Sequence, residues 1–137
     1  MIKPNHILLV DDDEDDQFLF TDALAEIDRS IRLEIAFNGL DALAALHKAA
    51  VLPDVIFMDI YMPLMNGLDC LRRLKAIERL KNIPVVVLSA TKGVIQQQMA
   101  ASGAILLLTK PFLYPELKHH ITEGLAGNLL YGQVAGI

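Results

Sequence analysis

The architecture of this chain is set by one stretch, Val55-Ile56-Phe57-Met58-Asp59-Ile60-Tyr61-Met62-Pro63. Four apolar residues run into a single carboxylate, and a nearby proline prevents the strand from continuing. This pattern predicts a buried parallel strand that delivers Asp59 to its carboxyl end, at a rim of the sheet. An aspartate in this position can also simply cap the turn before the next helix, so the rest of the chain has to decide between the two interpretations.

The composition predicts one soluble domain. A length of 137 residues allows a sizeable core, and the apolar runs are shorter than the ~20 residues that a membrane crossing requires. The single cysteine, Cys70, cannot form an internal disulfide and is typical of a reducing compartment, so we expect a cytoplasmic protein. The excess of 17 acidic over 12 basic residues disfavours direct DNA binding, because no positive field is present to attract phosphates.

Strand-like and helix-like segments alternate along the chain. Short apolar runs predict strands at 6–10, 32–37, 55–59, 85–88 and 105–109, and each is followed by a segment with helical periodicity. The third helix follows Asn66-Gly67 and carries an apolar stripe that ends at Ile77. It also carries five basic residues that a solvated face would explain: Arg72, Arg73, Lys75, Arg79 and Lys81. The alternation predicts an α/β fold, a doubly wound five-stranded parallel sheet with helices on both faces.

Six consecutive acidic residues follow the first strand. Asp15 and Asp16 fall in the first turn of a helix, where the helix dipole favours negative charge. Asp11 and Asp12 belong to the strand end and need another explanation. A calcium-binding EF-hand loop is an alternative, but Asp16 stands where such a loop requires glycine, and a strand precedes it in place of a helix.

Polar groups follow four of the five predicted strands: the pair Asp11-Asp12, then Asp59, Ser89 and Lys110. If the first strand is central and the third, fourth and fifth follow on one side, these side chains converge, because ligand sites lie at the carboxyl ends of parallel strands. Three carboxylates would repel one another, and a hydrated Mg²⁺ relieves that repulsion. Asp59 could then attack phosphorus, with the hydroxyl and the ammonium group holding phosphoryl oxygens.

These residues resemble the receiver domain of two-component response regulators. The resemblance lies in Leu9-Val10-Asp11-Asp12, Met58-Asp59-Ile60-Tyr61-Met62-Pro63, Ser89-Ala90 and Lys110-Pro111-Phe112, which occur in the family's order. It implies the flavodoxin-like strand order 2-1-3-4-5, a receiver domain over residues 1–125 and a C-terminal tail or helix extension over 126–137. It also implies a chemotaxis-regulator-like, stand-alone protein, since no output domain follows in this sequence.

The resemblance assigns roles to the acidic residues. Asp59 would be the phosphoryl acceptor, and the donor would be a histidine kinase or a phosphorelay protein. Asp12, Asp59 and the backbone carbonyl of Tyr61 would hold Mg²⁺, with Asp11 assisting through water. Such a protein is a phosphoacceptor that signals by binding and not an enzyme, apart from self-phosphorylation from small donors and self-dephosphorylation.

The resemblance also assigns the switch. Ser89 would be the switch hydroxyl, and Lys110, placed by a cis peptide before Pro111, would pair with the phosphoryl group. The family usually has an aromatic residue where this chain has Leu107, which places signalling through an aromatic rotamer in question. Downstream partners would bind the surface formed by the fourth helix, the fifth strand and the fifth helix.

Tyr61 and Thr91 occupy positions that flank the route of attacking water in this family. A tyrosine there could shield the phosphoryl group, so we expect slow self-dephosphorylation.

Three alternatives stay open. A degenerate receiver could act only as a scaffold, although the phosphotransfer residues are all present. A haloacid-dehalogenase-like phosphohydrolase would use Asp11 as its nucleophile, but Asp15 departs from that motif. His119 and His120 could carry a phosphoryl group themselves, although a favourable interaction with the helix dipole explains them more simply.

Overall fold

The computed structural model describes residues 5–89, 94–104, 106–109, 114–126 and 133–134. The strands are β1 (His6–Val10), β2 (Arg32–Ala36), β3 (Val55–Asp59), β4 (Val85–Ser89), β5 (Leu106–Thr109) and β6 (Gln133–Val134). The helices are α1 (Glu14–Ile27), α2 (Gly39–Lys48), α3 (Gly67–Ala76), α4 (Val94–Ala101) and α5 (Tyr114–Ala126). Within these ranges no helix is both long enough and apolar enough to span a membrane.

The strands form one parallel sheet in the order β2-β1-β3-β4-β5-β6. The predicted order 2-1-3-4-5 is therefore confirmed, with one correction. The sheet has a sixth strand, because two residues of the segment predicted to be a tail or helix extension pair with β5, through Leu106 with Gln133 and Leu107 with Val134. A strand of two residues is too short to produce an alternating pattern in the sequence.

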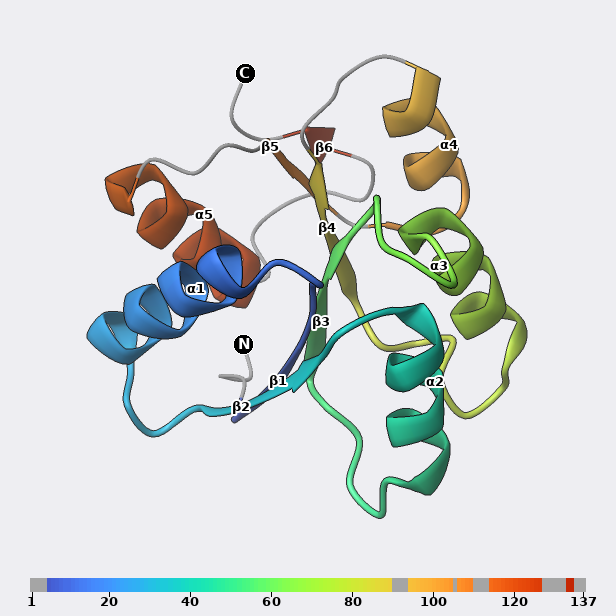
Figure 1. Ribbon diagram of the computed structural model, residues 1–137, viewed down its shortest axis with the longest axis horizontal. Helices are drawn as coiled ribbons and strands as arrows, with labels where there is room; N and C mark the ends of the chain where they lie inside the picture. Colours follow the sequence, from blue (N-terminus) through green and yellow to red (C-terminus); the bar gives the residue numbers. More distant parts are fainter. Residues whose placement is uncertain (1–4, 90–93, 105, 110–113, 127–132, 135–137) are drawn as a thin grey trace.

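Helices cover both faces of the sheet, with α1 and α5 on one face and α2, α3 and α4 on the other (Figure 1). Successive strand residues point to opposite faces, so the strands contribute side chains to two separate hydrophobic cores. The core shared with α1 and α5 contains Ile7, Leu9, Val55 and Phe57, and the core on the other face contains Leu8, Val10, Ile56 and Met58. Burial on both faces explains why the strand before Asp59 is continuously apolar.

Asparagine and aspartate side chains cap the first turns of α1, α2 and α3. Asn38 accepts a hydrogen bond from the Asp41 backbone N–H, and Asn66 accepts one from the Asp69 N–H, each at 2.9 Å. Asp13 caps α1, because its Oδ1 accepts hydrogen bonds from the backbone N–H groups of Asp15 and Asp16. These caps satisfy helical N–H groups that have no partner within the helix, and they fix where each loop ends.

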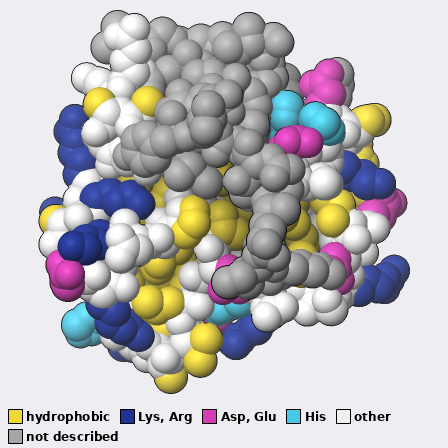
Figure 2. Space-filling view, turned by 180° about the vertical axis from the view of Figure 1, so that it is seen from behind, with side chains coloured by type: hydrophobic (Ala, Val, Ile, Leu, Met, Phe, Trp, Pro, Cys, Tyr) yellow, Lys and Arg dark blue, Asp and Glu magenta, His cyan; other side chains and the backbone are white. Residues whose placement is uncertain are grey.

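Two basic side chains near the end of α3, Lys75 and Arg79, hold backbone carbonyls in place, whereas the sequence indicated only a solvated face. Most of the Lys and Arg side chains visible in Figure 2 gather on the flank of α2 and α3. Arg79 donates hydrogen bonds to the backbone carbonyls of Leu46, at 2.9 Å, and of Ala49, and so caps the end of α2. Lys75 donates to two backbone carbonyls at 3.0 and 3.1 Å, and burial lowers the pKa of its ammonium group. The predicted apolar stripe ends one turn early, because Ile77 lies beyond α3 and is 42% exposed.

Replacing Arg79 with alanine is expected to lower the free energy of unfolding by about 2 kcal/mol, because charged hydrogen bonds to carbonyls at the end of α2 are lost. Arg72 is an exposed basic residue of the same segment, and Arg72→Ala should change stability by no more than about 0.5 kcal/mol. Urea unfolding of the two variants measures the difference. Equal effects would show that Arg79 has no capping role.

Cys70 is buried on the inner face of α3, as the sequence suggested, with its Sγ 3.8 Å from the Gly39 carbonyl oxygen. Burial raises the pKa of its thiol to about 12, and the charge of Arg73 only partly opposes this shift. The folded protein therefore holds this proton more tightly than the unfolded chain, and the resulting stability is present below pH ~8.5 and is lost as the pH rises towards 12.

Iodoacetamide is accordingly expected to label Cys70 at least about tenfold more slowly in the native protein than in urea at pH 8, because the thiolate is the reactive species. Mass spectrometry of timed samples gives both rates. Labelling at the same rate in both states would contradict a buried, protonated thiol.

Candidate acidic site

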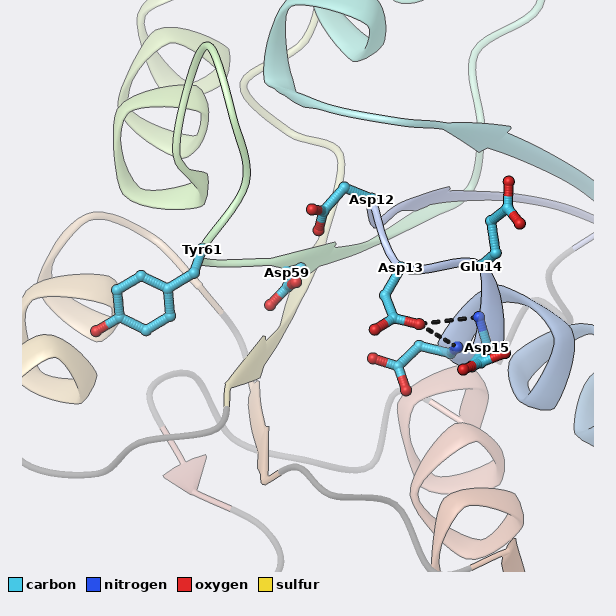
Figure 3. Close-up of a pocket in the computed structure, with 7 residues that line it drawn as sticks. Asp12, Asp13, Glu14, Asp15, Asp59 and Tyr61 are labelled. Atoms are coloured by element: carbon cyan, nitrogen blue, oxygen red, sulfur yellow. Dashed lines mark hydrogen bonds between the residues drawn. The ribbon is translucent and has the colours of Figure 1, made fainter.

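An open pocket of about 640 Å³ lies at the carboxyl ends of β1 and β3 (Figure 3). Among the described residues, its lining is acidic apart from Tyr61, and the acidic residues are Asp12, Asp13, Glu14, Asp15, Asp16 and Asp59. Three of these, Glu14, Asp15 and Asp16, form the first turn of α1, where the helix dipole stabilises them. The acidic run therefore divides as predicted into a helix start and a strand end.

Three carboxylates from two strand ends come together in this region. Asp11, Asp12 and Asp59 each offer one carboxylate oxygen, and these oxygens all lie within 4.8 Å of one another. Asp11 and Asp59 are only 1% and 7% exposed, whereas Asp12 is exposed. Carboxylates this close repel one another strongly. A set of oxygen donors with excess negative charge fits a hard divalent cation such as Mg²⁺.

Hydrogen bonds hold Asp11 in place at the junction of β1 and α1. Its N–H donates to the Ala36 carbonyl of β2 at 3.0 Å, and its Oδ1 accepts from the Asp13 N–H at 3.0 Å. Its own carbonyl oxygen accepts from Nε2 of Gln17 at 2.7 Å. This contact could not be predicted, because nothing in the helical periodicity of α1 distinguishes a glutamine that reaches back to the strand end.

The loop after β3 folds back tightly over the strand end. Oδ1 of Asp59 accepts from the Ile60 N–H at 2.8 Å, and the Ile60 carbonyl accepts from the Gly67 N–H at 2.7 Å. A Cβ atom at Gly67 would overlap the Asp59 carbonyl oxygen and would lie 2.9 Å from Cα of Ile60. Gly67 is thus required by the site, although the sequence suggested only that it opens a helix.

The same loop contains a strained turn. Leu64 has a φ of 69°, and the Met65 N–H donates to the Pro63 carbonyl at 2.8 Å, which closes a three-residue turn around it. Left-handed φ values are unfavourable for a residue with a branched side chain, so the surrounding structure has to maintain this turn. Leu64 is 79% exposed, and its side chain therefore gains little from burial in return.

Tyr61 lies at the edge of the pocket and is 57% exposed. In Figure 3 its ring points away from Asp59. Shielding of a group on Asp59 by this ring, as the sequence suggested, would require the side chain to rotate.

The other predicted site residues lie at or beyond the ends of β4 and β5. Ser89 is the last residue of β4, directly after Leu88, which pairs with Asp59. The backbone of β4 therefore brings Ser89 to the same edge of the sheet, but its side chain lies outside the described part of the structure. Thr91, Lys110 and the peptide before Pro111 lie outside the described residues altogether. The side chain of Leu107 is also outside them, while its backbone forms part of β5.

Comparison with known proteins identifies the family. The family described as response regulator receiver domain matches residues 7–122. The chain is 36% identical over 116 residues to the transcriptional regulatory protein PrrA of Mycobacterium tuberculosis, with 81% of this chain and 46% of PrrA covered. It is 33% identical over 117 residues to the polar-differentiation response regulator DivK of Brucella anthropi, with 82% of this chain and 89% of DivK covered. The chain thus spans about half the length of PrrA and most of DivK.

Solved structures show the same fold. The phosphorylated cyanobacterial phytochrome response regulator RcpA superposes with a TM-score of 0.81 at 27% identity, over 89% of this chain and 94% of RcpA. The Mn²⁺-bound form of response regulator Rcp1 superposes with a TM-score of 0.80 at 28% identity, over 93% of this chain and 99% of Rcp1. The chain therefore belongs to the response regulator receiver domains of two-component systems.

Proposed function

We propose that this receiver domain accepts a phosphoryl group on Asp59 in a Mg²⁺-dependent reaction and signals by phosphorylation-dependent protein binding. The observation that carries the proposal is the cluster of Asp11, Asp12 and Asp59, whose oxygens lie within 4.8 Å of one another beside an open pocket. The similarity to a phosphorylated regulator and to a Mn²⁺-bound regulator supports the same chemistry. The donor would be a phosphohistidine of a histidine kinase or of a phosphotransfer protein.

The transfer needs only one nucleophile from this chain. A carboxylate oxygen of Asp59 attacks phosphorus, a P–O bond forms, and the P–N bond to the donor histidine breaks as the imidazole leaves and takes up a proton. Asp11, Asp12, Asp59 and the Tyr61 backbone carbonyl would hold Mg²⁺, with Asp11 acting through water. When bound, the ion supplies positive charge that offsets the repulsion between Asp59 and the phosphoryl oxygens.

Two side chains outside the described part of the structure complete the proposal. Ser89 would donate its hydroxyl to one phosphoryl oxygen, and Lys110 would pair with another. Their movement on phosphorylation would alter the surface of α4, β5 and α5, which we propose as the binding surface for a downstream protein. Helix α4 carries no acidic residue in its first turn and no basic residue in its last, so apolar and amide contacts would dominate there. We place the protein in the cytoplasm, where kinases of this class present their phosphohistidine.

Intact mass after incubation with acetyl phosphate and Mg²⁺ tests the proposed function. The wild type should gain one phosphoryl group, and the gain should disappear in Asp59→Asn and in the presence of EDTA. An adduct that persists in Asp59→Asn would place the chemistry elsewhere. No adduct in the wild type would favour a receiver that serves only as a scaffold.

The phosphoryl group is expected to persist for minutes or longer in the purified protein, because the ring of Tyr61, which lines the pocket, would hinder the attacking water if it turned over Asp59. Tyr61→Ala should shorten the lifetime about tenfold, which corresponds to about 1.4 kcal/mol in the barrier to hydrolysis. Decay of the adduct mass after removal of acetyl phosphate measures both lifetimes. Loss of the group within seconds in the wild type would contradict a shielding role.

A further inference from the structure

Gln17 is a polar residue on the otherwise apolar buried face of α1, which it shares with Phe20, Ala23 and Leu24. It is only 9% exposed, and its Nε2 donates a buried hydrogen bond of 2.7 Å to the carbonyl oxygen of Asp11. Burial of an amide side chain is costly unless it is hydrogen-bonded, so this side chain is committed to the contact.

This hydrogen bond restrains the peptide that joins Asp11 to Asp12. The Asp11 carbonyl belongs to the same rigid peptide plane as the Asp12 N–H and Cα. A bond to that oxygen therefore fixes the orientation of the peptide from which the Asp12 side chain projects. Two further hydrogen bonds of Asp11 run to β2 and to Asp13 within the loop, whereas the bond from Gln17 ties the peptide to the body of α1.

The carboxylate cluster needs such a restraint. Asp12 is exposed, and its repulsion from Asp11 and Asp59 favours movement of the loop away from the cluster when no cation is bound. A loop that relaxes has to be reordered when the ion binds, and this cost reduces affinity. A hydrogen bond that holds the peptide in place lowers that cost, as supporting contacts do at other metal sites.

We propose that Gln17 is a positioning residue for the cation site: it holds the Asp11-Asp12 peptide in the orientation that keeps the three carboxylates together. This inference rests on the proposed function, because it assigns Gln17 a role in binding the ion that the cluster would hold. It extends the site from the strand ends into the core-facing side of α1.

Calorimetric titration with Mg²⁺ tests the inference on the full chain. Gln17→Met keeps a neutral, flexible side chain of similar size and removes the donor, and it should weaken Mg²⁺ binding about tenfold. Hydrogen exchange of the cation-free protein gives a second result, since the Asp12 and Asp13 amides should exchange faster in the variant while the amides of β3 do not. Gln17→Leu serves the same purpose if the methionine variant does not fold.

Thr21→Val provides a matched control on the same helix. It removes the 2.8 Å hydrogen bond from the Thr21 hydroxyl to the Gln17 carbonyl and leaves the bond to Asp11 in place, so Mg²⁺ affinity should stay within about twofold of the wild type. If Mg²⁺ affinity and amide exchange were unchanged in both Gln17 variants, the role of Gln17 would be overturned while the proposed cation site would stand. A wild type that binds no Mg²⁺ would overturn the proposed cation site, and the role of Gln17 with it.

Discussion

Alanine at position 67 is expected to lower the free energy of unfolding by about 3 kcal/mol or more. The added methyl group would overlap the backbone oxygen of Asp59 and would crowd Cα of Ile60, and neither of these backbone atoms can move without displacing the end of β3. The hydrogen bond from the Gly67 N–H to the Ile60 carbonyl, 2.7 Å long, would be strained by the same movement. Urea unfolding gives the loss of stability, and acetyl phosphate labelling of the folded fraction should be slowed because Asp59 is displaced.

Gly39→Ala is the matched control for this prediction. Gly39 also begins a helix, but its new methyl group would lie 3.0 Å from the flexible side chain of Met65 and 3.1 Å from Cβ of Cys70, so these contacts require a shift of only a few tenths of an ångström and no overlap with backbone atoms. The expected loss is about 1 kcal/mol or less. If the two alanine variants were equally stable, the tight approach of the β3–α3 loop to Asp59 would not be a constraint on this sequence.

Asp12→Asn is expected to stabilise the cation-free protein by about 1 kcal/mol and to abolish its stabilisation by Mg²⁺. The first effect follows because one of three clustered carboxylates loses its charge, and the second because an oxygen ligand of the ion is weakened. In the wild type, Mg²⁺ at 100 times its dissociation constant should add about 2.7 kcal/mol to the free energy of unfolding. Thermal unfolding with and without Mg²⁺ measures both quantities.

Asp15→Asn is the matched control for the predicted loss of stabilisation by Mg²⁺. Asp15 lines the same pocket but belongs to the first turn of α1 and not to the three-carboxylate cluster. Its loss removes the same charge from the pocket, so Mg²⁺ should still stabilise this variant by nearly the wild-type amount. Equal loss of the Mg²⁺ effect in both variants would mean that the pocket attracts cations only through its total charge.

The regular parts of the fold could be predicted because each rests on a local pattern. Continuous apolar runs identified the strands that the sheet buries on both faces, and Asn-Gly pairs identified the starts of α2 and α3. The convergence of Asp11, Asp12 and Asp59 followed from the strand order, because β1 and β3 are neighbours in the sheet. The roles of Ser89, Thr91 and Lys110 stay predictions.

The features that could not be predicted depend on contacts between distant segments. Arg79 lies in a basic run that is typical of a solvent-exposed face, yet its side chain caps the end of α2, some thirty residues earlier in the chain. The need for glycine at position 67 appears only when the loop is seen against Asp59. The role of Gln17 likewise depends on a contact that appears only in the fold. Its amide donates to the Asp11 carbonyl because the start of α1 lies against the end of β1.

Identification of the phosphorylated residue tests the central claim most directly. An acyl phosphate is reduced by borohydride, which converts a phosphorylated aspartate to homoserine and leaves other aspartates unchanged. Peptide mapping of the wild type after acetyl phosphate, Mg²⁺ and borohydride should find homoserine at position 59 and at no other acidic position. Homoserine at Asp11 or Asp12, or a phosphoryl group on His119 or His120 with Asp59 intact, would contradict Asp59 as the acceptor.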